Sequence, residues 1–328
     1  MLEFVLFGAG RIGSIHGRNV AAHPQARIRY VVDVNQQFAA QLAAELGATV
    51  TSVEEALADP AVNAVIIASS TDTHADLIEA SAKAGKAIFC EKPVDLDLER
   101  ARSCETIVNA AGVPCSLGFN RRYDPSFRAL QQAMSNGKIG NLEQVIITSR
   151  DPSPPPVSYI KVSGGLFRDM MIHDLDIARW LLGEEPVEVF ATASNLVDPA
   201  IGAAGDVDSA MVTLKTASGR MCQISNSRRA VYGYDQRIEV FGSQGMLQAG
   251  NHTPTTVTFA GEPGVVSDKP LHFFLERYAD AYRNELQDFV DAIVSGSTPL
   301  TGIRDGIRAL ELAEACIASL ETGKAVKL

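Results

Sequence analysis

An imidazole and a carboxylate lie four residues apart in a segment of helical pattern, at His173 and Asp169. On a helix this spacing places the two side chains one turn apart on the same side. An imidazole beside a carboxylate can take the proton of a hydroxyl group, because the carboxylate orients the ring and stabilises the imidazolium. The same pair also fits a helix-surface contact without a chemical role. Asp174 and Asp176 add acidic groups, but Asp174 points elsewhere on the helix and no further ligand group is evident, so we predict no metal site.

A lysine stands at the end of an apolar run, in the tripeptide Glu91-Lys92-Pro93. At a strand end that faces a nicotinamide ring, its ammonium group could donate to a substrate oxygen and stabilise the charge that forms there. Pro93 would fix the backbone, and a cis peptide bond is one way to do so. Taken by itself, Lys92 is more typical of a surface lysine.

The first residues of the chain contain the pattern G-x-G-x-x-G, which runs from Gly8 through Gly10 to Gly13 and includes Arg11 and Ile12. It directly follows a predicted strand and precedes a predicted helix, as in dinucleotide-binding turns. The first glycine would permit the tight turn, the second would let a pyrophosphate approach the backbone, and the third would let helix pack on strand. The helix N-terminus offers N–H groups to the phosphates. The alternative is a turn whose glycines serve packing alone.

Asp33 ends the next predicted strand, twenty residues after Gly13. In this position an acidic residue accepts hydrogen bonds from the adenosine ribose and repels a 2′-phosphate. No Lys or Arg occurs between residues 34 and 82, so this segment supplies no cation for NADP, and the predicted cofactor is NAD. Ser70, Thr71 and His74 follow the fourth predicted strand at its carboxyl end and are candidate cofactor contacts, with helix capping by Thr71 or Thr73 as the alternative.

Short apolar runs alternate with segments of helical period up to residue 119, which predicts a doubly wound parallel sheet of the Rossmann type. The predicted strands are 3–7, 28–33, 48–50, 64–68, 87–90 and 115–118, and the predicted helices are 11–22, 35–46, 53–58, 74–84 and 97–111.

Residues 120–328 follow a different pattern, typical of an α+β domain with an open, mainly antiparallel sheet. Its predicted helices are 123–135, 166–182, 276–294 and 303–321, and its predicted strands are 143–149, 186–194, 207–217, 219–228, 236–241 and 246–249. The proline-rich run 151–156 is interpreted as a stiff loop. We therefore expect a dinucleotide-binding domain over 1–119 and a substrate-binding and oligomerisation domain over 120–328.

Composition narrows the class of partner. A formal net charge of −10 and the lack of a basic stripe argue against nucleic acid and against an anionic membrane surface. The apolar run 2–7 is too short for a signal peptide, and no stretch has the length of a membrane helix. Five scattered cysteines without a C-x-x-C pair favour unpaired thiols in a reducing cytoplasm.

Together these motifs resemble the Gfo/Idh/MocA oxidoreductase family and, more narrowly, its inositol 2-dehydrogenase branch. The glycine turn and Glu91-Lys92-Pro93 are typical of the superfamily. The narrower resemblance rests on segments 118–125, 148–152, 164–174 and 232–237, and the likeness runs along the whole chain.

The resemblance implies oxidation of myo-inositol to its 2-keto product (scyllo-inosose) with NAD as the oxidant. It implies that His173 takes the hydroxyl proton, Asp169 orients His173 and Lys92 hydrogen-bonds the oxygen, and that the protein is a homotetramer formed through its open sheets. Glu91 and Lys92 would also border the cofactor, and the predicted substrate contacts are completed by Asn120, Arg122, Asp151 and Tyr234. Two alternatives stay open: a dehydrogenase of another cyclic polyol or a pyranose (scyllo-inositol, D-chiro-inositol or glucose), and a non-catalytic cofactor-sensing regulator.

Overall fold

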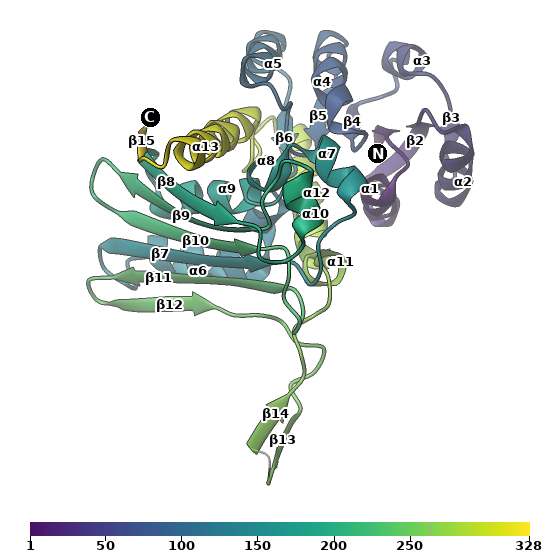
Figure 1. Ribbon diagram of the computed structural model, residues 1–328. Coiled ribbons are helices and arrows are strands. Elements are labelled where there is room, and N and C mark those ends of the chain that lie inside the picture. Colours follow the sequence, from purple (N-terminus) through teal and green to yellow (C-terminus); the bar gives the residue numbers. More distant parts are fainter. Residues whose placement is uncertain (263) are drawn as a thin grey trace. The chain divides into compact units, whose positions relative to one another are not determined.

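The computed structural model describes residues 1–262 and 264–328. It consists of two compact units, each with its own sheet (Figure 1). Unit 1 comprises Met1–Asn120 together with Tyr282–Leu310, and unit 2 comprises Arg121–Ala281 together with Glu311–Leu328.

Unit 1 contains a six-stranded parallel sheet of order β3-β2-β1-β4-β5-β6, the doubly wound order of a Rossmann domain. The predicted fold class is therefore confirmed. Its strands are β1 (Leu2–Phe7), β2 (Ala26–Val32), β3 (Thr49–Val50), β4 (Ala64–Ile67), β5 (Ala87–Cys90) and β6 (Cys115–Leu117). Its crossover segments contain α1 (Arg11–Ala22), α2 (Gln36–Leu46), α3 (Val53–Ala58), η1 (Thr71–Thr73), α4 (His74–Lys83) and α5 (Leu98–Ala111).

The core of unit 1 explains why part of the C-terminal region belongs to it. Strands β4 and β5 are buried along their whole length, as expected for a parallel sheet covered on both faces. Leu286, Phe289 and Val290 lie in the same hydrophobic cluster as Phe4 and Phe89. The expected second domain, taken as 120–328, thus differs from unit 2, because the apolar face of residues 282–310 completes the core of the first sheet.

Unit 2 contains a seven-stranded sheet of order β12-β11-β7-β10-β9-β8-β15. Only β7 and β10 pair in parallel among these strands, so the sheet is mainly antiparallel, as predicted. The strands are β7 (Leu142–Arg150), β8 (Pro186–Ser194), β9 (Ser209–Thr216), β10 (Met221–Ser227), β11 (Asp235–Gly242), β12 (Gly245–Ala249) and β15 (Val326–Lys327).

Helices cover one face of this sheet (Figure 1). Helix α9 (Ile172–Leu182) lies against β7 and β10, and α6 (Pro125–Ser135) lies against β12. The remaining helical segments are η2 (Asn120–Tyr123), α7 (Val157–Ser163), α8 (Gly165–Asp169), α10 (Pro199–Ala203), α11 (Phe274–Arg277), α12 (Ala279–Ser295) and α13 (Ile303–Thr322). Helices α7 and α10 were not predicted.

The predicted helix 166–182 is two helices in the structure. Helix α8 ends at Asp169 and α9 begins at Ile172. The N–H of Met171 donates to the carbonyl oxygen of Leu166, five residues back, at 2.9 Å. A hydrogen bond that spans five residues widens the helical turn. Asp169 and His173 are therefore not separated by a regular α-helical turn.

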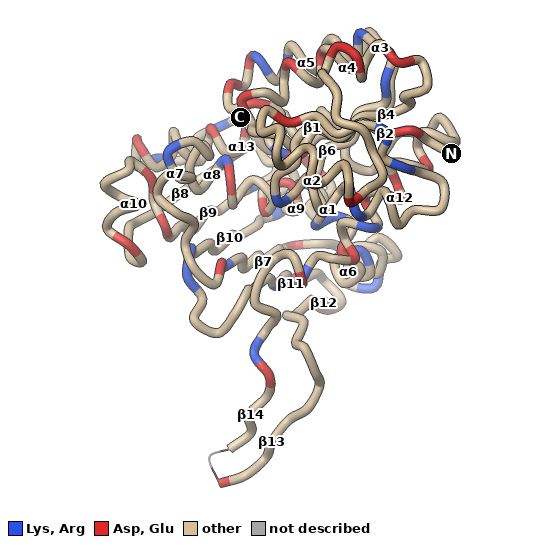
Figure 2. Tube along the Cα trace, turned by 90° about the vertical axis from the view of Figure 1, so that its right-hand side faces the viewer, with Lys and Arg blue, Asp and Glu red and all other residues tan. Residues whose placement is uncertain are grey.

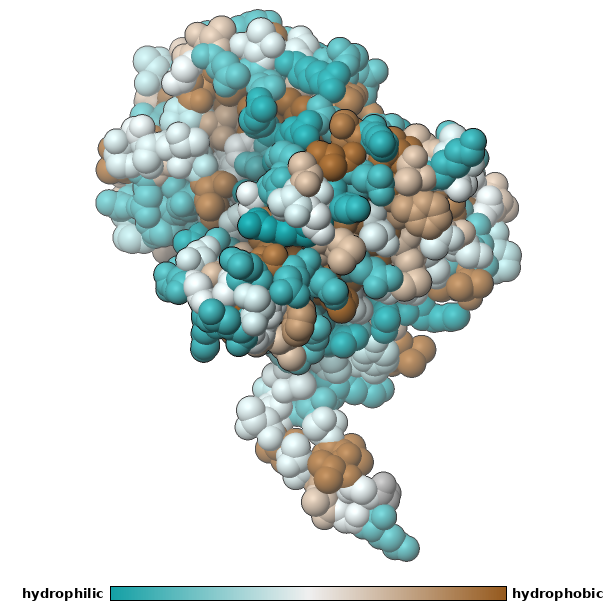
Figure 3. Space-filling view, turned by 90° about the vertical axis from the view of Figure 1, so that its left-hand side faces the viewer, coloured by the Kyte–Doolittle hydropathy of each residue, from teal (hydrophilic) through white to brown (hydrophobic). Residues whose placement is uncertain are grey.

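The opposite face of the unit 2 sheet is open. Large apolar side chains on it are exposed, among them Ile146, Phe190, Met211, Met221, Phe241 and Met246. A separate hairpin, β13 (Thr258–Gly261) with β14 (Gly264–Ser267), projects from this unit on two extended connections (Figure 1). Apolar residues gather on it (Figure 3), including Phe259, Val265 and Val266.

Charged residues of both signs are interspersed along the chain (Figure 2). Across the described residues, no helix combines the length and the apolar character needed to span a membrane.

Candidate functional site

The glycine turn has three glycines with three different surroundings. Gly8 has φ +101°, a left-handed conformation that favours glycine, and a Cβ there would meet the backbone of Ala68 at 2.5 Å. A Cβ on Gly13 would lie 1.9 Å from the carbonyl oxygen of Gly8. Gly10 instead faces open space, with no atom within 4 Å of the position that a Cβ would take apart from its local backbone and chain neighbours. The second glycine therefore leaves room that a ligand could enter.

Helix α1 begins directly at this open space. Its N-cap is Gly10, which has no side chain to cap the first turn. The N-terminal N–H groups of the helix and its positive dipole end are suited to a phosphate. Arg11 is exposed at the first helical position, and Ile12 is partly exposed.

Asp33 follows β2 and contacts the turn. Its Oδ2 accepts from the Ala9 N–H at 2.6 Å, and its Oδ1 accepts from the Asn35 N–H at 2.7 Å. A carboxylate offers about four lone-pair positions, so these two bonds leave acceptor capacity for a ribose diol. The side chain is partly exposed, which keeps that capacity accessible.

The segment after β4 differs from the expectation. His74 is buried, its Nδ1 lies 2.8 Å from the carbonyl oxygen of Pro93, and its Nε2 lies 3.3 Å from that of Ser69. Burial lowers the pKa of His74. Because both ring nitrogens face backbone carbonyls, His74 ties the loops after β4 and β5 together, and neither nitrogen is directed at a cofactor.

Ser70 and Thr71 lie at the start of η1, at the carboxyl end of β4. Neither η1 nor α4 has a side-chain cap. The hydroxyl of Thr73 donates to the carbonyl oxygen of Ser70 at 2.8 Å, so Thr73 holds the 3-10 turn together. Ser70 is exposed and Thr71 is partly exposed, which leaves both accessible to a ligand.

The tripeptide after β5 is held from two sides. The Lys92–Pro93 peptide bond is cis, as considered from the sequence. Glu91 Oε1 lies 2.8 Å from His16 Nε2 on α1, and a Cβ on Gly118 would lie 2.7 Å from Glu91 Oε2. These contacts fix the backbone beside Lys92, whose side chain is partly exposed.

In unit 2, Asp169 ends α8 and His173 lies in the first turn of α9. Asp169 Oδ1 accepts from the Tyr159 hydroxyl at 2.9 Å, and its Oδ2 lies 3.5 Å from Arg228 Nη2. Both Asp169 and His173 are partly exposed, so a ligand can reach them.

Arg228 is a buried cation next to Asp169. Its guanidinium lies 3.5 Å from Asp169 and 3.7 Å from Asp206. Asp206 Oδ1 accepts from the Leu166 N–H at 3.0 Å, at the start of α8. A Cβ on Gly165, which has φ +83°, would lie 2.8 Å from that same oxygen. Gly165 thus lets Asp206 approach the helix and link it to Arg228.

Asp151 belongs to the same electrostatic group. Burial raises its pKa to about 6, and the carboxylates of Asp169 and Asp174 act in the same direction, while Arg228 and Arg121 oppose them. The Asp151 N–H donates to the carbonyl oxygen of Ser227 at 3.0 Å, which holds this loop beside β10. A carboxyl group with a pKa near neutrality can accept or donate to a hydroxyl group.

Tyr234 is buried and lies edge-on to Tyr278, with ring centroids 6.0 Å apart. Burial raises its pKa well above the ordinary value, so its hydroxyl stays protonated and can donate a hydrogen bond. Asn120 is also buried, at the last residue of the first segment of unit 1.

Arg122, which was predicted to contact the substrate, forms an ion pair with Asp176 in the structure. Its Nε donates to Asp176 Oδ2 at 2.8 Å and its Nη2 donates to Asp176 Oδ1 at 2.5 Å. Both side chains are buried. The bidentate ion pair joins η2 to α9, and it commits two donors of the guanidinium to the fold.

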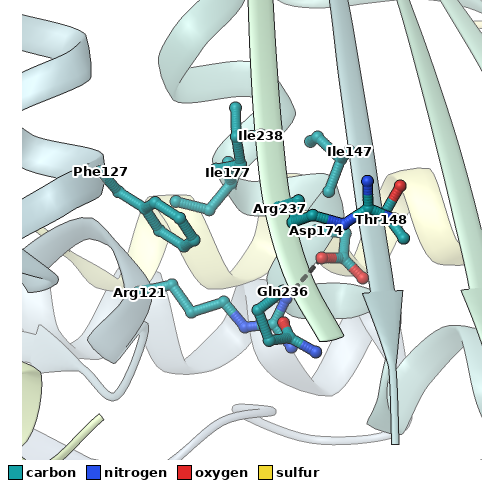
Figure 4. Close-up of a pocket in the computed structure, with 9 residues that line it drawn as sticks. All are labelled: Arg121, Phe127, Ile147, Thr148, Asp174, Ile177, Gln236, Arg237 and Ile238. Carbon is teal, nitrogen blue, oxygen red and sulfur yellow. Dashed lines mark hydrogen bonds and ion pairs between the residues drawn. The ribbon is translucent and has the colours of Figure 1, made fainter. Parts of the chain in front are cut away.

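A second buried pair lies next to it. Arg121 Nη1 donates to Asp174 Oδ1, and the other oxygen of Asp174 accepts from Asn226 Nδ2 at 2.9 Å. Figure 4 shows Arg121 and Asp174 pointing toward each other from separate elements. The cavity drawn there has no room for a water molecule, so it is part of the packed interior and not a substrate site. The predicted direction of Asp174, away from His173, is consistent with this pairing.

A larger hollow of about 600 Å³ opens on unit 2, at the base of the hairpin. Its lining includes Pro152, Tyr232, Lys269, His272 and Glu276 and none of the predicted site residues.

Sequence reasoning did not identify Tyr159 and Arg228 as neighbours of Asp169, or Asp206 as a neighbour of Arg228. The order of residues held no signal for them, because they come from three segments that only the folded sheet and the Gly164-Gly165 turn bring together. The positive φ of both glycines, +87° and +83°, marks that turn.

Comparisons with known proteins agree with this geometry. Residues 2–119 match the model of an oxidoreductase family with an NAD-binding Rossmann fold, and residues 127–248 match the GFO/IDH/MocA C-terminal domain. The chain is 50% identical to the inositol 2-dehydrogenase of Rhizobium meliloti (strain 1021), over 100% of this chain and 99% of that protein. It is 47% identical to the myo-inositol 2-dehydrogenase of Thermotoga maritima, over 98% of this chain and 97% of that protein.

A solved structure gives the same result for the fold. The chain is 30% identical to scyllo-inositol dehydrogenase from Lactobacillus casei, solved with NAD(H) and scyllo-inositol bound, with a TM-score of 0.92 over 100% of this chain and 99% of that one. The open space at Gly10, the uncapped start of α1 and the acceptor capacity of Asp33 fit the same cofactor.

Proposed function

Because the chain belongs to the GFO/IDH/MocA family of NAD-binding oxidoreductases, we propose that it oxidises myo-inositol to 2-keto-myo-inositol (scyllo-inosose). The observation that carries this proposal is the agreement along the full length with two relatives named for inositol oxidation, at 50% and 47% identity. The glycine turn that would hold the cofactor is intact in sequence and in geometry.

The residues of unit 1 would bind the cofactor. Gly10 leaves space for the pyrophosphate at the start of α1, in a turn that Gly8 and Gly13 allow to pack closely, with Arg11 and Ile12 at its border, and Asp33 accepts from the ribose. Ser70, Thr71 and the Glu91-Lys92 backbone would border it at the carboxyl ends of β4 and β5. NAD, when bound, accepts the hydride that leaves the substrate carbon.

Three side chains would act on the reacting hydroxyl group. His173 accepts its proton, and Lys92 donates a hydrogen bond to the oxygen as its negative charge grows. Asp169 keeps His173 oriented, and it is itself held by the Tyr159 hydroxyl and the Arg228 guanidinium. This support fixes the carboxylate despite the interruption between α8 and α9.

The other hydroxyl groups of a cyclic polyol need both acceptors and donors. Asp151 would accept from them and Tyr234 would donate to them, with Asn120 able to do either. Arg122 would contribute by holding η2 against α9 through Asp176, since this ion pair occupies its guanidinium.

Scyllo-inositol is the competing substrate, because the protein of the Lactobacillus casei structure is named for it. The two isomers differ in the orientation of one hydroxyl group. The deciding experiment follows NADH absorbance over a panel of inositol isomers and aldoses, with NAD and with NADP. We expect the highest kcat/KM with myo-inositol and NAD. A myo-inositol rate equal to the blank would refute the substrate assignment, and a higher kcat/KM with NADP would refute the role of Asp33.

We propose further that the protein is a cytoplasmic homotetramer. An exposed apolar face on an open sheet and an isolated two-stranded hairpin are both features that association covers. The five cysteines are unpaired and buried, which suits a reducing compartment. Light scattering coupled to gel filtration tests the assembly, and a monomeric mass at micromolar concentration would refute it.

A further inference from the structure

Three ionisable side chains converge inside unit 1, and one of them, Glu91, directly precedes Lys92 in the sequence. His16 comes from α1, Glu91 follows β5, and Glu285 comes from α12. One nitrogen or oxygen of each lies within 4.8 Å of the others. His16 is 1% exposed and Glu285 is 0% exposed, so this cluster lies within the protein interior.

Two members of the cluster are tightly held. The His16 ring packs against Phe89 and Tyr282, with centroids 4.9 Å and 5.6 Å away, and its Nε2 lies 2.8 Å from Glu91 Oε1. The other oxygen of Glu91 lies against Gly118, where any side chain would collide with it. These contacts therefore hold the Glu91 carboxylate in one position. Glu91 directly precedes Lys92 in the sequence.

Glu285 is different. Both of its carboxyl oxygens are buried, and neither has a hydrogen-bond partner among the described residues. An ionised carboxylate in this position would have lost its water without compensation, which is costly. A second carboxylate, Glu91, lies within 4.8 Å and would repel it. Burial, followed by the charge of Glu91, raises the pKa of Glu285 well above its ordinary value.

We propose that Glu285 is a positioning residue, which remains a neutral carboxylic acid at neutral pH beside the Glu91 carboxyl group. One proton on Glu285 removes the repulsion between the two carboxyl groups. Glu91 then keeps its contact with His16, and the backbone of Lys92 keeps the position that this contact sets. A neutral acid can also donate a hydrogen bond within the cluster after a small rotation, which an ionised one cannot.

Infrared difference spectroscopy tests the protonation state directly. A protonated carboxylic acid has a carbonyl stretching band that a carboxylate lacks. We expect the spectrum of the wild type minus that of Glu285→Gln, both at pH 7.5 without substrate, to contain this band. The same subtraction with Asp291→Asn, an exposed acidic residue on α12, should not contain it. A difference spectrum without the band in Glu285→Gln overturns the proposal.

The positioning role, which rests on the proposed function, is tested by kinetics. Glu285→Gln keeps a neutral polar group of nearly the same shape, so kcat with myo-inositol should stay within about twofold. Glu285→Leu removes the polar group, and kcat should fall roughly tenfold or more while the KM for NAD changes little. Equal losses in the two variants overturn the role. If Glu285→Leu does not fold, a large loss of kcat in Glu285→Gln overturns the positioning role.

Metal content provides the remaining comparison. A divalent cation held by the same three side chains would neutralise both carboxylates in place of the proton. One equivalent of metal in the purified protein, lost in Glu285→Gln, overturns the proposal. The infrared band is measured without any substrate, so failure of every inositol to react refutes the proposed function while leaving the protonation of Glu285 to its own test.

Discussion

Gly13 faces the carbonyl oxygen of Gly8 so closely that a Cβ atom on Gly13 would lie 1.9 Å from it. The N-terminus of α1 can approach the end of β1 only because this atom is missing. Gly10, between them in the sequence, has no protein atom within 4 Å of its Cβ position apart from its own local backbone and chain neighbours. One motif therefore contains a glycine required by packing and a glycine whose neighbouring space is left to a ligand.

This difference predicts that one alanine variant weakens NAD binding and the other lowers stability. Gly10→Ala keeps an allowed backbone conformation, with φ −72°, so the free energy of unfolding should stay within about 0.5 kcal/mol of the wild type. Its methyl group would occupy the phosphate space, and the KM for NAD should rise at least tenfold. Gly13→Ala should unfold at markedly lower temperature, because the backbone must move. Thermal unfolding and NAD titration measure both effects, and normal NAD affinity in Gly10→Ala would contradict the assignment.

Much of unit 1 was predictable, because local pattern and global topology agree there. The apolar runs of β1, β4 and β5 are short, continuous and followed by helical periods, which is what a covered parallel sheet requires. Asp33 could be placed because it ends the strand after the turn. The role of Leu286, Phe289 and Val290 could not, since an amphipathic helix does not reveal which of two sheets it covers.

The reacting groups of the proposed site in unit 2 could be predicted from the sequence, but the residues that hold them in position could not. His173 and Asp169 are close in sequence, so a helical count relates them, although it missed the wider turn at Met171. Arg228 and Tyr159 reach Asp169 through folding of distant segments, which leaves no periodic signal. For the same reason, sequence type alone could not distinguish Arg122, paired with Asp176, from a ligand-binding arginine.

Asp151 should show a pH-dependent effect on stability. Its pKa rises from 3.8 to about 6 on folding, so the folded protein binds this proton more tightly than the unfolded chain. Its contribution to stability is fully present below pH about 4 and is lost as the pH rises through about 6. Asp151→Asn cannot ionise, so it should be more stable than the wild type at pH 7.5 and nearly equal to it at pH 4.

The same variant should lose activity, because an amide cannot replace a carboxylate as acceptor on both oxygens. Urea unfolding at the two pH values, together with kcat/KM for myo-inositol at pH 7.5, measures the two effects. Greater stability combined with lower activity is the pattern of a residue kept for function. A variant less stable than the wild type at pH 7.5 would show that Asp151 is held mainly by Arg228 and Arg121.

Removal of the Asp174 carboxylate, which is paired with Arg121 in the interior, should lower stability, in contrast to Asp151→Asn. Asp174→Ala leaves the Arg121 guanidinium buried without this carboxylate, which typically costs about 3–5 kcal/mol of unfolding free energy. The double variant Arg121→Met with Asp174→Leu removes both charges and should recover most of that loss. Urea unfolding at pH 7.5 decides, and a loss under about 1 kcal/mol in the single variant would mean that Asn226 and Ser149 suffice to hold the network.

The hairpin offers a test of assembly that leaves the site untouched. Phe259 pairs across the strands with Val266, and both are exposed. Phe259→Asp places a charge on this apolar surface, so a tetramer that covers it should dissociate at concentrations where the wild type stays assembled. Light scattering measures the mass, with Glu262→Asp at the exposed turn as a control. An unchanged mass would limit the interface to the open sheet.

His173 carries the proton transfer in the proposed reaction, so its removal should affect the chemical step and not the cofactor. We expect His173→Ala to lower kcat by about 100-fold or more, while the affinity for NAD stays unchanged. Asp169→Asn keeps a partner for Tyr159 but weakens support for an imidazolium, and its kcat should fall less. His252, an exposed histidine of the same unit, provides the control, and His252→Ala should keep full activity. If His173→Ala and His252→Ala have the same kcat, another group accepts the proton, and Lys92 becomes the first residue to examine because it is the other proposed contact of the reacting oxygen.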